Sequence, residues 1–274
     1  MGIIGWPVEH SLSPALHGAA FAALGLDFAY VPLPVAPDRV GEAVRGLRAL
    51  GFRGANVTIP HKGAVLPHLD WLERDAALAE AVNTIVVVED GALRGYNTDI
   101  AGFTRALDEA LDEPLAPGAP ALVLGAGGAA RAAALALARR GASLTIVNRT
   151  APHAARLRDL VAAAVPGGAV SVVPWDDLDE AHVSAQRVLV NATSLGMERA
   201  GKVPRALADN VIAGQVVADF VYTNGLTGLL AQAQAQGAAV VDGLAVLVYQ
   251  AAAAFELWTG VAAPVQAMCR AVGR

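Results

Sequence analysis

The chain alternates short apolar runs with segments in which apolar residues recur at helical spacing. Runs bounded by glycine, proline or polar clusters predict buried β-strands, and the segments between them predict helices. Before residue 112 the predicted strands are 2–5, 28–32, 54–57, 84–88 and 93–96, and the predicted helices are 14–24, 39–50 and 99–111. After residue 120 the predicted strands are 121–124, 143–147, 170–173, 188–190, 216–220 and 239–241, followed by a helix at 244–258 and a final helix. This alternation is typical of an α/β fold.

The strand at 121–124 leads into a glycine turn and then into an alanine-rich helical pattern. The turn fits the form G-x-G-x-x-G/A, and it contains Gly125, Ala126, Gly127, Gly128 and Ala129, with Ala130 at the last position. Glycine lets the backbone approach a pyrophosphate, and the unpaired N–H groups of a helix start point at it. Because strand, turn, helix and second strand follow in order, the pattern predicts a dinucleotide site. The alternative is a tight strand–helix turn without a ligand.

The end of the second strand indicates which dinucleotide binds. It carries Asn148, Arg149 and Thr150, where an NAD-preferring site usually has Asp or Glu. A guanidinium beside a hydroxyl suits a 2′-phosphate. The sequence therefore predicts NADP, and the alternative is a solvated surface arginine.

A stiff connector rich in proline at residues 114–120 precedes this unit. We predict two α/β domains. Residues 1–101 plus 243–274 form the first, and residues 102–242 form the second, a Rossmann-type doubly wound parallel sheet. The last two helices are assigned to the first domain because the second sheet is complete without them. We expect the active site in a cleft between the domains, which closes on binding.

Composition excludes several classes of protein. The chain has 274 residues, 55% of them hydrophobic, with a mean hydropathy of +0.45, a net charge of −5 and a pI near 5.7. The longest uncharged apolar stretch, 220–241, is broken by amides and glycines, and the first residues have no basic leader. The single cysteine excludes an internal disulfide, and no zinc spacing is present. We expect a cytoplasmic protein that binds neither membrane, nucleic acid nor metal, as a monomer or homodimer.

Four polar islands lie in the first half of the chain, each at the end of an apolar element. They lie at residues 10–14, 56–62, 82–84 and 97–99, and they supply many hydroxyls and amides but two charges of note, Lys62 and Asp99. Ligands collect at the carboxyl ends of strands in open α/β sheets, so we expect these islands there. Their chemistry suits a small substrate with many hydroxyls. Each island alone could equally be a helix cap or a turn.

Hydride transfer at a carbonyl carbon requires a proton at the oxygen. Of the two charged residues, Lys62 is the better candidate to supply this proton, because its ammonium also stabilises the negative charge that develops on the alkoxide oxygen. Asp99 can hold that ammonium in position and share in the proton transfer.

These residues together resemble the shikimate dehydrogenase family, from Gly5 to about Gly260. The matching runs are 11–14, 56–62, 81–84, 97–99, 125–131, 148–150, 191–197 and 250–260. The resemblance implies NADP-dependent reduction of 3-dehydroshikimate to shikimate in aromatic amino-acid (chorismate) biosynthesis. It implies that Lys62 and Asp99 are the catalytic pair. It also implies that the residues around the substrate are Ser11, Ser13, Thr58, Asn83, Tyr222 and Gln250, with the two serines and Tyr222 near its carboxylate. Gly243 and the main chain at Phe220 would lie by the nicotinamide.

Three positions depart from the family pattern. His153 stands where members commonly carry a basic residue, which predicts a weaker or pH-dependent grip on the 2′-phosphate. Asn224 replaces a proline two places after Tyr222. Val246 replaces a methionine three places after Gly243, in the packing around the nicotinamide.

Other functions remain to be weighed. A hydrolase is excluded, because the strand-to-turn serine at Ser194 is followed by no histidine. A non-catalytic NADP sensor would have no reason to keep Lys62 and Asp99. A quinate or aminoshikimate dehydrogenase on the same scaffold stays open, although the resemblance associates two small hydroxyls, here Ser11 and Ser13, with shikimate enzymes and so favours shikimate.

Overall fold

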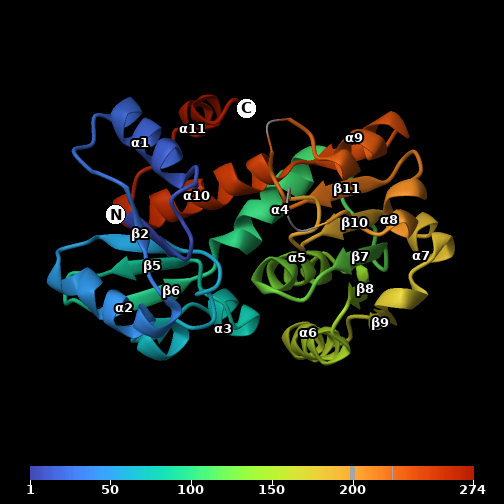
Figure 1. Ribbon diagram of the computed structural model, residues 1–274, viewed down its shortest axis with the longest axis horizontal. Helices are drawn as coiled ribbons and strands as arrows, with labels where there is room; N and C mark the ends of the chain where they lie inside the picture. Colours follow the sequence, from blue (N-terminus) through green and yellow to red (C-terminus); the bar gives the residue numbers. More distant parts are fainter. Residues whose placement is uncertain (198–200, 224) are drawn as a thin grey trace. The chain divides into compact units, whose positions relative to one another are not determined.

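The computed structural model describes residues 1–197, 201–223 and 225–274. The chain divides into two compact α/β units (Figure 1). The first unit contains Met1–Gly102 and Leu247–Arg274, and the second contains Phe103–Val246. None of the helices in the described part of the chain is both long and apolar enough to cross a bilayer.

The first unit contains a mixed six-stranded sheet in the order β2-β1-β3-β5-β6-β4. Its strands are β1 (Gly2–Gly5), β2 (Val31–Pro34), β3 (Gly54–Val57), β4 (Trp71–Leu72), β5 (Thr84–Val87) and β6 (Leu93–Tyr96). β1 runs parallel to β2 and β3, whereas β5 runs antiparallel to both β3 and β6. One edge of the sheet therefore collects the carboxyl ends of β1, β3 and β6 together with the amino end of β5.

The helices of this unit include α1 (Ser13–Leu24), α2 (Val40–Ala49), α3 (Arg74–Ala79) and α11 (Val265–Ala271). One face of α2 carries Val40, Val44 and Leu47 at helical spacing, and it is buried against the sheet. Helices α1 and α11 lie side by side (Figure 1). The end of α10 (Gly243–Thr259) joins this unit, where the Trp258 indole donates to the Ile85 carbonyl at 2.9 Å.

Two predictions for this unit need correction. The strand predicted at 28–32 forms at Val31–Pro34 instead, because pairing with β1 begins where the Val31 amide donates to the Met1 carbonyl. Before that point Tyr30 is buried and stacks on His17, so it serves the core rather than the sheet. The pattern also missed β4 and α3, which at two and six residues are too short to show a period.

The second unit contains six parallel strands in the order β12-β11-β10-β7-β8-β9. They are β7 (Pro120–Leu124), β8 (Ser143–Asn148), β9 (Val170–Pro174), β10 (Val188–Asn191), β11 (Val216–Asp219) and β12 (Ala239–Val241). Counted from β7, this is the Rossmann order, with the switch point between β7 and β10. The prediction of an α/β fold with a Rossmann-type sheet is confirmed.

Helices cover both faces of this second sheet. α5 (Gly128–Arg139) and α6 (Ala151–Ala164) lie together, and α7 (Glu180–Ser184), α8 (Arg205–Asp209) and α9 (Gly228–Ala235) form a second group (Figure 1). The alanines of α5 from Ala130 to Ala138 are buried, so the helix packs closely on the sheet. That packing brings the start of α5 to the carboxyl end of β7.

Candidate active site

The two charged residues of the polar islands meet in the first unit. Lys62 follows β3, and Asp99 lies in the first turn of α4 (Thr98–Ala110), directly after β6. The Lys62 ammonium donates to Asp99 Oδ2 at 2.5 Å, and the two side chains are only 19% and 10% exposed. Partial burial strengthens the attraction and limits the positions open to the ammonium. Asp99 therefore holds the Lys62 ammonium at a fixed position at this edge of the sheet.

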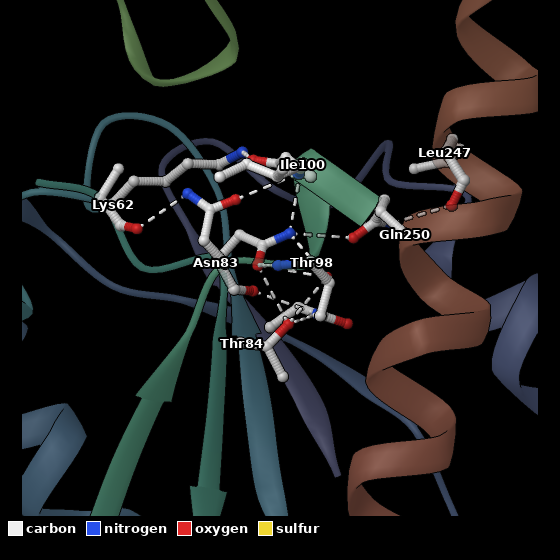
Figure 2. A network of polar contacts seen from close by, with 11 residues as sticks. Lys62, Asn83, Thr84, Thr98, Ile100, Leu247 and Gln250 are labelled. Atoms are coloured by element: carbon white, nitrogen blue, oxygen red, sulfur yellow. Dashed lines mark hydrogen bonds and ion pairs between the residues drawn. The ribbon is translucent and has the colours of Figure 1, made fainter. Parts of the chain in front are cut away.

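Asn83 lies at the centre of the polar network, between Lys62 and Gln250 (Figure 2). Its Oδ1 accepts a hydrogen bond from the Thr98 amide at 2.7 Å. Its Nδ2 approaches Asp99 Oδ1 at 2.9 Å, Thr98 Oγ1 at 2.9 Å and Gln250 Oε1 at 3.2 Å. Asp99 is thus held through both oxygens, by Lys62 on one side and Asn83 on the other. Because an amide nitrogen has two hydrogens, three acceptors share two donors.

Asn83 also corrects an expectation about the islands. We expected every island at the carboxyl end of a strand, yet Asn83 directly precedes β5. The antiparallel direction of β5 between β3 and β6 brings its amino end to the same edge. The island at residues 82–84 therefore lies beside the others because β5 is antiparallel; in an all-parallel sheet it would lie at the opposite edge.

A second layer of this network was not assigned from the sequence. Asn56 donates to the Asn83 carbonyl at 3.1 Å and to Thr84 Oγ1 at 3.0 Å, and it accepts from the Tyr30 hydroxyl at 2.6 Å. The Thr84 and Thr98 hydroxyls lie 3.2 Å apart beside Asn83. The sequence feature that could have indicated this layer is Asn56, an amide side chain within an apolar strand, because a buried amide needs hydrogen-bond partners nearby.

The capping alternatives can now be tested one by one. Ser13 does not cap α1, which begins after Leu12 without a side-chain cap, and Ser11 Oγ instead accepts from the Ser13 amide at 3.2 Å. Asn97 does act as a cap, because its Oδ1 accepts from the Ile100 amide at 3.4 Å. Thr58 is half-buried after β3, with its methyl against Gly5, where a Cβ would lie 2.5 Å away.

The glycine turn of the second unit fits a bound pyrophosphate. Gly125 has φ +115°, and a Cβ there would lie 2.9 Å from the Ala192 carbonyl oxygen. Gly127 precedes α5 without any capping side chain, and a Cβ there would meet nothing within 4 Å. The first amides of α5, at Gly128 and Ala129, therefore have no capping side chain, and the space beside the Cα of Gly127 is open.

The predicted 2′-phosphate residues lie at the carboxyl end of β8. Asn148 Nδ2 donates to the Thr150 carbonyl at 3.0 Å, which closes the turn. Thr150 is the N-cap of α6, although its hydroxyl does not cap the helix. Arg149 and His153 are exposed. A polar, solvent-facing turn with an uncommitted hydroxyl suits an anion of the size of phosphate.

Buried Asp219 organises the segment that carries Phe220 and Tyr222. Its carboxylate accepts from the Thr227 hydroxyl at 2.7 Å, from Asn191 Nδ2 at 2.9 Å and from the Val221 amide at 3.0 Å. Burial raises the pKa of Asp219 above its usual value. These three donors partly offset that cost and fix the main chain after β11.

The start of α10 lies against this segment. A Cβ at Gly243 would come within 2.7 Å of the Phe220 and Val221 carbonyl oxygens, so the structure brings Phe220 and Gly243 together. Tyr222 is 37% exposed, and Val246 is buried. Asn224, the second departure from the family pattern, lies outside the described residues.

Comparison with known proteins assigns the chain to a family. The shikimate dehydrogenase (NADP(+)) of Rubrobacter xylanophilus is 50% identical over 275 residues, which cover 99% of this chain and 94% of that protein. The chain belongs to the shikimate dehydrogenase family. Three family models match it: the shikimate dehydrogenase substrate binding domain at residues 3–85, shikimate / quinate 5-dehydrogenase at 113–207, and the shikimate 5′-dehydrogenase C-terminal domain at 243–272.

Solved structures of shikimate dehydrogenases and their relatives share the fold. Shikimate 5-dehydrogenase from Thermus thermophilus, in complex with NADP(H) and shikimate, has a TM-score of 0.87 and 37% identity, covering 100% of this chain and 98% of that chain. Quinate dehydrogenase from Corynebacterium glutamicum, in complex with NAD, has a TM-score of 0.90 and 33% identity, covering 99% and 97%. The predicted shikimate dehydrogenase family is confirmed, whereas the roles of single residues stay predictions.

Proposed function

We propose that this chain catalyses the reversible NADP-dependent reduction of 3-dehydroshikimate to shikimate, in aromatic amino-acid (chorismate) biosynthesis. The observation that carries the proposal is the Lys62–Asp99 ion pair, which Asn83 holds at a sheet edge rich in neutral polar groups. A sequence identity of 50% to a shikimate dehydrogenase (NADP(+)) over 99% of this chain supports the same reaction.

Lys62 handles the proton in this proposal. NADPH, when bound, would supply the hydride for reduction, and NADP⁺ would accept it in the reverse direction. The Lys62 ammonium donates a proton to the substrate oxygen as a carbonyl becomes a hydroxyl, and the amine takes it back in the reverse direction. Asp99 keeps the nitrogen in place throughout, because its other oxygen is bound to Asn83.

The first unit would hold the substrate, mainly through neutral donors and acceptors. We assign this role to Ser11, Ser13, Thr58, Asn83 and Gln250, and we assign Tyr222, with the two serines, to the substrate carboxylate. A substrate hydroxyl can replace the longest of the three contacts of Asn83 Nδ2, the one to Gln250. Binding at Asn83 therefore need not disturb its hold on Asp99.

The second unit would hold NADP. The pyrophosphate is assigned to Gly125, Ala126, Gly127, Gly128 and Ala129, where no side chain fills the space in front of α5. The 2′-phosphate is assigned to Asn148, Arg149, Thr150 and His153, and the nicotinamide to Phe220 and Gly243. We also propose residues 1–101 plus 243–274 as the substrate-binding catalytic domain and residues 102–242 as the NADP-binding domain, so that Gly243 stands at the boundary between the two.

The test is a spectrophotometric assay of NADP⁺ reduction with shikimate, quinate and no substrate side by side, repeated with NAD⁺. We expect turnover with shikimate and NADP⁺ well above the other combinations. Turnover with quinate alone would instead favour the second candidate, a quinate dehydrogenase, which the similarity to the Corynebacterium glutamicum enzyme keeps open. No turnover with either acid would contradict the proposal. A cytoplasmic location and a monomeric or homodimeric state stay predictions.

A further inference from the structure

The Arg149 side chain lies over the indole of Trp175. β8 and β9 are parallel neighbours, with Asn148 opposite Pro174, so the next residue of each strand leaves the sheet at the same edge. The guanidinium carbon of Arg149 lies 6.0 Å from the centroid of the Trp175 ring. This distance is within the range of a cation–π contact.

The two partners differ in how firmly they are held. Trp175 begins a short 3-10 helix (Trp175–Asp177), and its partly buried side chain packs against the core that contains Leu178 and Val183. Arg149 is exposed, and its guanidinium makes no ion pair or hydrogen bond with any residue that the structure describes. A guanidinium stacks through its face and donates in its plane. Arg149 can therefore rest on the indole and still present all its donors to an anion.

We propose that Trp175 is a positioning residue that sets the preference for a 2′-phosphorylated dinucleotide by holding the Arg149 guanidinium ready for the phosphate. The inference rests on the proposed NADP function. An exposed arginine normally samples many rotamers, and the indole reduces that number before the ligand arrives. His153, at the position where the family usually has a second basic residue, makes the orientation of Arg149 more important in this chain.

Binding of small adenosine ligands separates this role from catalysis. Adenosine 2′,5′-bisphosphate and adenosine 5′-monophosphate differ only in the 2′-phosphate, and isothermal titration calorimetry measures both without turnover. From the strength of an exposed cation–π contact we expect Trp175→Leu to weaken bisphosphate binding roughly two- to fivefold and to leave monophosphate binding unchanged. Trp175→Phe keeps an aromatic face on the same core and should retain most of the bisphosphate affinity.

A double-mutant cycle tests whether Trp175 acts through Arg149. In an Arg149→Ala background, Trp175→Leu should cause no further loss of bisphosphate affinity. Equal losses for both ligands, or a full loss in the Arg149→Ala background, would overturn the proposal. A wild-type protein that prefers the bisphosphate while Trp175→Leu binds it equally well would overturn the role of Trp175 alone. A wild-type protein with no preference for the bisphosphate would overturn the NADP assignment and this inference with it.

Discussion

The two candidate sites are built differently. In the first unit a network of hydrogen-bonded side chains surrounds Lys62, whereas in the second unit the glycine turn consists of main chain with few side chains around it. Asn83, Thr84, Thr98 and Asp99 are all buried and bonded to one another. At the carboxyl edge of the second sheet, by contrast, a Cβ at Gly127 would meet no atom within 4 Å, and Arg149 is exposed.

This difference follows from what each unit is proposed to bind. A proton must move at one atom of a small substrate, so the groups that move it need fixed positions. A pyrophosphate is recognised by amides at a helix start, and any side chain there would stand in its way. Substitutions in the first unit should therefore change turnover, and those in the second should change cofactor binding.

The largest effect is expected from Lys62→Ala. Loss of the ammonium removes the proton donor, so kcat should fall about a hundredfold or more while KM for shikimate changes only a few-fold. Steady-state kinetics with saturating NADP⁺ measures both. Lys202→Ala is the matched control, because Lys202 is the only other lysine in the sequence and is exposed. Unchanged turnover in Lys62→Ala would remove Lys62 from proton transfer.

Gly127→Ala tests the proposed pyrophosphate site in the glycine turn of the second unit. The added methyl would occupy open space in the protein, so the thermal midpoint should stay unchanged. It would occupy space assigned to the pyrophosphate, which should cost about 2 kcal/mol of cofactor binding, or roughly thirtyfold in KM, for NADPH and NADH alike.

Gly46→Ala in α2 is the control for this change, since a Cβ at Gly46 also meets nothing within 4 Å. Gly125→Ala, by contrast, should lower the thermal midpoint, because its φ is +115° and the Ala192 carbonyl oxygen is in the way. A Gly127→Ala protein with wild-type KM values would show that no pyrophosphate lies in front of α5.

The contrast also explains how much could be predicted from the sequence. The glycine turn was found because its function depends on local pattern, a strand, a turn and a helix within thirty residues. The Lys62–Asp99 pair was named from the islands and from the family resemblance. The bonds of Tyr30 and Asn56 were not, because these residues lie 26 positions apart and meet only where the start of β2 and β3 flank β1 in the folded sheet. The antiparallel direction of β5 was likewise set by the whole sheet.

Arg149→Ala should have a more selective effect than Gly127→Ala. Loss of a charged donor to the 2′-phosphate should raise KM for NADPH about tenfold more than KM for NADH. Arg158→Ala, at an exposed arginine within α6, should change neither value. Equal changes for NADPH and NADH would show that the Arg149 guanidinium does not bind the 2′-phosphate.

The smallest effect on activity is expected from His17→Phe, at the one place where the first unit leaves a buried polar side chain unbonded. Neither ring nitrogen of His17 has a hydrogen-bond partner within the described residues, and the ring stacks on Tyr30 at 4.3 Å. Burial lowers the pKa of His17 from 6.5 to about 3. Below about pH 6.5 the unfolded chain therefore binds a proton at His17 that the folded protein does not bind. The contribution of His17 to the unfolding free energy is fully present above that pH and falls as the pH drops towards 3.

Between about pH 7 and about pH 5 this residue should cost wild type about 2 kcal/mol of unfolding free energy. Urea unfolding at both pH values measures the loss, and His17→Phe should lose about 2 kcal/mol less than wild type because phenylalanine does not titrate. If the larger ring disturbs the packing with Phe21 and Phe255, His17→Leu provides the same comparison with a smaller side chain. Turnover at neutral pH should stay within about twofold of wild type, because neither ring nitrogen of His17 is hydrogen-bonded to Lys62, Asn83 or Asp99. An equal loss of stability in wild type and both variants would show that the buried ring is not what makes the first unit sensitive to acid.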